Sequence, residues 1–127
     1  MHSISTPAAP TPAGHYSQGI IHDGLVYVAG QLPLDPITAQ VVGDGDIEAQ
    51  TEQVLRNVAA VLEAANSGLD QLLSVTLFVT GRELWGPVNG VFARMLGDHR
   101  PARAIVPVSE LKPGCLIEVQ AIAKQRT

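Results

Sequence analysis

The spacing of hydrophobic residues changes along the chain, and each spacing predicts a different element. In the segment 72–79 aliphatic residues occupy every second position, which is typical of a half-buried strand. Between residues 20 and 28 two short apolar runs flank an Asp-Gly pair, a strong signal for a β-hairpin. Two further strands are expected at 103–108 and 115–124.

Helical spacing appears in two other segments. Apolar residues between positions 54 and 65 recur at intervals of three and four, which predicts an amphipathic helix. Asp46 is a good N-cap for this helix, and Gly68 is a suitable stop. A second helix is expected over 84–96, where the apolar side chains fall on one face.

The order of elements is β-β-α-β-α-β-β, which predicts a single α+β domain over residues 1–127, with two helices packed on one face of a mixed sheet. Residues 1–13 are rich in proline and are expected to form an extended, poorly ordered arm. The apolar sheet residues exceed what one layer of helices can cover, so we expect self-association to cover the other face. These residues are Val75, Leu77, Val79, Ile117, Val119 and Ile122.

Composition narrows the class of protein. With 46% hydrophobic and 16% charged residues the chain is globular rather than disordered. The net charge of -4 and the scattered Lys and Arg residues disfavour a nucleic-acid partner. A single cysteine, no signal-peptide pattern and no apolar run of the roughly 18 residues that a membrane span needs predict a cytoplasmic protein.

The sequence lacks the motifs of several kinds of catalytic site. The four histidines are isolated, so no pair has the spacing of metal ligands. A phosphate-binding glycine loop and a serine nucleophile motif are both missing. The sequence therefore predicts a site that uses neither metal nor cofactor.

Arg103 is the first candidate, because it opens an apolar strand after Pro101-Ala102. A guanidinium in that position can hold a carboxylate with two parallel hydrogen bonds. The alternative is a structural ion pair at the strand edge with Asp98 or Glu110.

Glu118 is the second candidate, since it lies in the middle of an otherwise apolar strand. Burial would raise its pKa and suit it to proton exchange with a water molecule. The alternative is a solvent-facing sheet position. Tyr16 could lie over a cleft or cap the sheet, and Asn89 could reach a pocket or stay exposed. Cys115 is expected to be a small core residue.

Several short segments together resemble the RidA (YjgF) family of imine and enamine deaminases. They occur in order from about residue 13 to residue 124, nearly the whole chain. The matching segments are Gly14-His15-Tyr16-Ser17-Gln18, Ala29-Gly30-Gln31-Leu32-Pro33 with Asp35-Pro36, Asn57-Val58, Val88-Asn89, Pro101-Ala102-Arg103 and Ile117-Glu118-Val119-Gln120-Ala121-Ile122-Ala123.

This resemblance implies a chorismate-mutase-like homotrimer whose sheets form a central barrel, with sites between subunits. It implies that water adds to a 2-imino or 2-enamino acid such as 2-aminoacrylate and releases ammonia and a 2-keto acid. Arg103 matches the family's carboxylate-binding arginine, and Glu118 matches the acid that holds the water. Tyr16, Gly30 and Asn89 match positions in the substrate pocket.

The chain departs from the family pattern in places. Ala29 replaces a serine, so a hydroxyl contact is missing. Ile105 stands where a cysteine is common, at a position that binds substrate mainly through its backbone, and narrows the pocket. His15 replaces a proline, and Gln120 replaces a second glutamate.

Other functions remain open from the sequence. One alternative is a catabolic deaminase for a dicarboxylic enamine of the 2-aminomuconate type, with Arg100 or Arg94 as the second anion contact. Another is a non-catalytic regulatory trimer that binds small metabolites, which the substitutions Ala29 and Ile105 favour. A ribonuclease ranks last because the chain is acidic.

Overall fold

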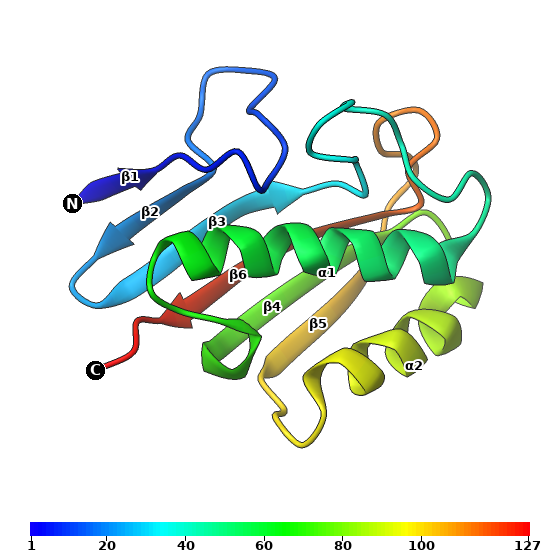
Figure 1. Cartoon of the computed structure of the whole chain (residues 1–127). Coiled ribbons are helices and arrows are strands. Elements are labelled where there is room, and N and C mark those ends of the chain that lie inside the picture. Colours follow the sequence, from blue (N-terminus) through cyan, green and yellow to red (C-terminus); the bar gives the residue numbers. More distant parts are fainter.

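In the computed structural model, which describes residues 1–127, six strands form one mixed sheet in the order β1-β2-β3-β6-β4-β5 (Figure 1). All neighbouring strands are antiparallel except β4 and β5, which are parallel. The strands are β1 (His2–Ile4), β2 (Gly19–His22), β3 (Leu25–Gln31), β4 (Leu72–Val79), β5 (Ala102–Pro107) and β6 (Ile117–Lys124). The predicted α+β fold with a mixed sheet is confirmed.

Two helices cover one face of the sheet, as predicted (Figure 1). Helix α1 (Ile47–Ala64) packs on β3 and β6, and α2 (Trp85–Leu96) packs beside α1. Short 3-10 helices, η1 (Leu69–Gln71) and η2 (Arg82–Leu84), precede β4 and α2. Neither α-helix is long and apolar enough to cross a membrane.

The start of α1 was predicted correctly, but its end was not. The Asp46 side chain accepts a hydrogen bond from the Ala49 amide at 3.1 Å and so caps the first turn. The helix ends at Ala64, before Gly68, because Asn66 adopts a left-handed conformation with a φ of 57°. The Ser67 amide then donates to the Leu62 carbonyl at 2.8 Å, the bond of a Schellman motif, which asparagine also tolerates.

The apolar core lies between the helices and one face of the sheet. Six apolar sheet residues were expected to exceed what one layer of helices can cover. Five of them lie in this core and are at most 1% exposed: Val75, Leu77, Val79, Ile117 and Val119. The argument for self-association from these five residues was therefore wrong. The uncovered face carries polar side chains together with the 43%-exposed Tyr27 and the 37%-exposed Val106.

The proline-rich N-terminal segment is ordered against the sheet, contrary to the expectation of a loose arm. Its first residues form β1, which pairs with β2. The buried Gln18 side chain accepts from the Thr6 amide at 2.7 Å and donates to the Thr6, Ala9 and Pro10 carbonyls. These bonds give hydrogen-bond partners to backbone groups of this segment, because its proline residues interrupt the regular hydrogen bonding of a β-sheet.

Candidate functional site

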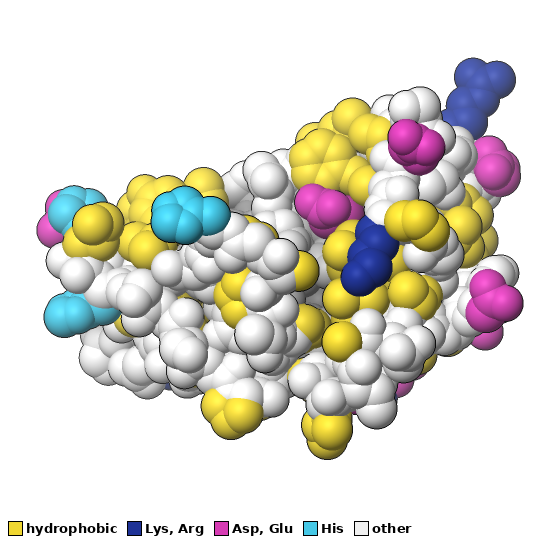
Figure 2. All heavy atoms as spheres, turned by 90° about the horizontal axis from the view of Figure 1, so that it is seen from above, with side chains coloured by type: hydrophobic (Ala, Val, Ile, Leu, Met, Phe, Trp, Pro, Cys, Tyr) yellow, Lys and Arg dark blue, Asp and Glu magenta, His cyan; other side chains and the backbone are white.

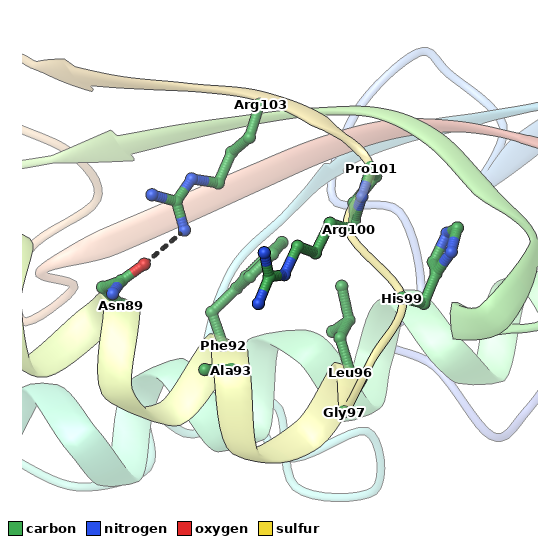
Figure 3. A pocket seen from close by; sticks show the side chains of 9 residues that line it. All are labelled: Asn89, Phe92, Ala93, Leu96, Gly97, His99, Arg100, Pro101 and Arg103. Carbon is green, nitrogen blue, oxygen red and sulfur yellow. Dashed lines mark hydrogen bonds between the residues drawn. The ribbon is translucent and has the colours of Figure 1, made fainter.

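Arg103 lies on β5 with its side chain directed toward α2 (Figure 3). Its Nη1 donates a hydrogen bond to Asn89 Oδ1 at 2.8 Å. The guanidinium carbon lies 5.0 Å from the ring centroid of Phe92 and 5.7 Å from that of Trp85. These three partners hold the guanidinium in place through an amide oxygen and two aromatic rings without neutralising its charge.

The alternative role of Arg103 as a partner in an ion pair is wrong. The salt bridges of the chain join other residues: His22 with Asp23, Arg56 and Arg94 with Glu52, and Arg126 with Asp70. The positive charge of Arg103 is therefore available to an external anion.

A cavity of about 510 Å³ opens beside Arg103, between α2 and the segment that leads into β5. Asn89 and Phe92 form part of its wall, and Arg100 lines it as well (Figure 3). Its volume lies within the range of about 300–1,000 Å³ that small-molecule sites occupy. The combination of a fixed cation and an accessible hollow is suited to binding a small carboxylate.

Glu118 lies on β6, opposite Phe78 of β4. Partial burial raises the pKa of its carboxyl group above the usual value. The side chain packs directly against the Cα of Gly30, where a Cβ atom would collide with Oε2 of Glu118. Gly30 thus provides the space that the carboxyl group occupies.

Tyr16 and Gly30 line a second, smaller cavity of about 90 Å³, together with Lys112. Tyr16 is 52% exposed, and its hydroxyl oxygen accepts a hydrogen bond from the Ala13 amide at 3.3 Å. Because Gly30 touches Glu118, these residues form a second group that is separate from the one around Arg103.

The two groups lie on opposite faces of the sheet. In the β4–β5 ladder Arg103 pairs with Val75, which points into the core beneath the helices. In the β4–β6 ladder Glu118 pairs with Phe78, three residues further along β4 and on the uncovered face. A single chain therefore does not bring the guanidinium and the carboxyl group together. Ile105 packs its side chain against the core and does not line the cavity beside Arg103.

The contact of Phe92 with the guanidinium of Arg103 was not predicted from the sequence, because Phe92 belongs to the apolar face of the helix expected over 84–96. The available signal was its spacing, since positions 85, 89 and 92 fall on one side of a helix. The acidic, histidine and cysteine side chains nowhere gather in groups of three that could hold a metal ion.

The fold and these two groups define a small α+β protein with a cationic hollow on one sheet face and a carboxyl group on the other. Residues 6–125 match a family model described as endoribonuclease L-PSP. A RutC family protein of Pyrococcus horikoshii is 43% identical over 120 residues, which is 94% of each chain. A putative regulator, AldR, of Lactococcus lactis is 39% identical over the full length of both chains.

Solved structures agree with this match. A putative endoribonuclease from Thermotoga maritima has a TM-score of 0.94 and 40% identity over 100% of this chain and 99% of its own. The YjgF gene product of E. coli has a TM-score of 0.92 and 33% identity, covering 99% and 100%. E. coli TdcF with bound serine has a TM-score of 0.93 and 29% identity, also covering 99% and 100%. The chain belongs to the RidA (YjgF) family, as its motifs indicated.

A testable prediction follows from the contact between Gly30 and Glu118. Gly30→Ala should leave the fold intact and lower any activity that depends on Glu118 by about 10- to 100-fold, because a displacement of about 1 Å at a reacting group has effects of that order. Steady-state kinetics and circular dichroism measure the two effects. Gly90→Ala is the matched control, since an added Cβ there meets no neighbouring atom. If the kinetics of Gly30→Ala equal those of wild type, Glu118 takes no part in the reaction.

Proposed function

We propose that this protein hydrolyses reactive 2-imino and 2-enamino acids, such as 2-aminoacrylate, to 2-keto acids and ammonia. The observation that carries the proposal is the fixed guanidinium of Arg103, which has no carboxylate partner within the chain and borders an open cavity. The relative TdcF, which has been crystallised with serine, supports a small amino-acid-like ligand.

The proposed site requires two copies of the chain, because Arg103 and Glu118 lie on opposite faces of the sheet. In a homotrimer, Arg103 of one protomer would face Glu118 of its neighbour across the subunit boundary. The exposed Tyr27 and Val106 on the uncovered sheet face would then become buried between subunits. Family membership favours this assembly.

In the proposed reaction Arg103 binds the substrate carboxylate and fixes the position of the adjacent imine carbon. An enamine first takes a proton on carbon and becomes the imine. Glu118 accepts a proton from water while the hydroxyl group adds to the C=N carbon and the nitrogen takes up a proton from solvent, which gives the neutral carbinolamine. Glu118 then returns its proton to the nitrogen, the C–N bond breaks and ammonia leaves, while the hydroxyl group loses its proton to solvent and becomes the C=O group of the keto acid.

The raised pKa of Glu118 suits this double role, because it makes the carboxylate a stronger base toward water and brings the pKa of the group nearer to the working pH, where both protonation states are used. Imine hydrolysis is already easy in water, so positioning and one acid–base group are sufficient without a cofactor.

The direct test generates 2-aminoacrylate from serine with a separate dehydratase and traps it with semicarbazide. Added protein should compete with the trap and lower the yield of semicarbazone while 2-keto acid and ammonia rise. A protein that competes neither for 2-aminoacrylate nor for bulkier imines, yet binds keto acids in calorimetry, would be a regulatory binder and not a deaminase.

The two-copy site can be tested by mixing inactive variants. Arg103→Ala and Glu118→Gln protomers, unfolded and reassembled together, should regain activity, with about one quarter of the sites intact if subunits assort at random in a symmetric trimer. Each variant reassembled alone is the control. Mixtures as inactive as the separate variants would contradict a site shared between protomers.

The endoribonuclease description of some relatives is not the function that we propose here. Of the eight Lys and Arg residues, three are paired with carboxylates, and the net charge is -4. On the face shown in Figure 2, basic side chains are few and widely separated, without a band that could follow a phosphate backbone. A salt-sensitive shift of single-stranded RNA would overturn this ranking.

A further inference from the structure

The cavity beside Arg103 contains a second arginine. Arg100 lies in the segment before β5, and its guanidinium points toward α2 as that of Arg103 does (Figure 3). Arg100 takes part in none of the salt bridges of the chain. One hollow therefore holds two guanidinium groups, and neither has a carboxylate partner.

The rest of the cavity wall does not neutralise these charges. No Asp or Glu is among the lining residues. His99 also lines the hollow, but its ring points away from the two arginines, and its Nε2 lies 2.8 Å from the Leu72 carbonyl oxygen (Figure 3). Two cations of fixed charge in one hollow create a local positive potential, which a ligand with two negative charges would offset.

Part of the cavity wall is apolar. Phe92, Ala93 and Leu96 of α2 form this apolar part, and Phe92 is only 6% exposed. Arg100 and Arg103 are three residues apart, and both guanidinium groups point toward α2 (Figure 3). A short methylene chain with a carboxylate at each end matches this pattern of charge, apolar surface and charge.

We infer that the site prefers dicarboxylates, so that 2-imino or 2-enamino dicarboxylic acids are better substrates than monocarboxylic ones. Arg103 holds the carboxylate beside the reacting carbon, and Arg100 holds the distal carboxylate over the surface of α2. The catalytic part of this inference rests on the proposed function, whereas the preference for a second carboxylate rests on the cavity alone. Arg100 is thus a residue that determines specificity and takes no part in the chemical step.

The kinetic test compares two imines of equal chain length, made by amino-acid oxidases from glutamate and from norvaline. In Arg100→Gln, KM for the glutamate-derived imine should rise about tenfold or more, because a charge-assisted hydrogen bond is lost. The kinetics of the norvaline-derived imine should not change. Arg56→Gln, which removes an exposed arginine of α1, is the matched control. Equal effects on both imines, or no effect on either, would overturn the inference.

A binding test separates this inference from the proposed function. By calorimetry, the assembled wild-type protein should bind 2-oxoglutarate about tenfold or more tightly than 2-oxopentanoate, and Arg100→Gln should lose the difference. If that preference appears but no imine is hydrolysed, the dicarboxylate site stands and the deaminase proposal fails. If imines are hydrolysed but 2-oxoglutarate shows no advantage, the deaminase stands and the inference fails.

Discussion

Arg103→Ala is expected to lower kcat/KM for 2-aminoacrylate by a factor of about 100 to 1,000, since it removes two charge-assisted hydrogen bonds to the substrate carboxylate. Loss of the guanidinium also removes the orientation that places the imine carbon near the water. Most of the effect should appear in KM and kcat together, because the same contact binds the substrate and positions it. Competition with semicarbazide at several substrate concentrations measures both constants.

The fold should survive this substitution. Arg103 is only partly buried, and its hydrogen-bond partner Asn89 is accessible enough for water to replace the lost donor. Arg56→Ala controls for the general loss of a positive charge. Arg103→Lys retains the charge but not the planar pair of donors, so its activity should be intermediate. An Arg103→Ala variant that is folded and fully active would show that Arg103 does not bind the substrate carboxylate.

Glu118→Gln should lower kcat by about 100-fold or more, because an amide cannot accept a proton from water. Its effect on KM should be small, since the substrate carboxylate binds to Arg103 and not to Glu118. This division between kcat and KM distinguishes the two residues in one kinetic experiment. Equal kcat values for wild type and Glu118→Gln would exclude Glu118 as the acid–base group.

The stability of Glu118→Gln provides an independent measurement. Burial raises the pKa of Glu118 in the folded protein above its value in the unfolded chain. The contribution of Glu118 to the free energy of unfolding is therefore most favourable at a pH below its pKa in the unfolded chain. This contribution is lost as the pH rises through the pKa of Glu118 in the folded protein. Above the folded pKa the ionised carboxylate opposes folding, so in that pH range the amide variant should have a thermal midpoint equal to or above that of wild type. Lower activity together with undiminished stability is the pattern of a functional residue.

The same shift in pKa predicts the pH dependence of the reaction. Activity that needs the carboxylate form should fall as the pH is lowered through the raised pKa of Glu118, at a higher pH than for an ordinary glutamate. Glu118→Gln should lose this limb of the profile in whatever activity remains.

The sequence determined most of the secondary structure and the family of this protein. Hydrophobic periodicity located α1, α2 and the strands from β2 onward, but not β1, because side-chain burial repeats with the geometry of each element. The cap at Asp46 was also local, since its bond reaches only three residues ahead. Arg103 and Glu118 were identified as candidates because a lone charge in an apolar strand calls for a partner or a role.

Only the tertiary structure decided where these two charges lie relative to each other. Within one strand, the alternation of side chains shows which residues share a face of the sheet. Which residues of two different strands share a face depends on the pairing register, which is set by packing and by the turns. The ladders place Arg103 beside Val75 and Glu118 beside Phe78, hence on opposite faces. Helix packing brought Asn89 and Phe92 onto Arg103, and Arg100 joined the same cavity. Such contacts join segments that are distant along the chain, and no local pattern of residues specifies them.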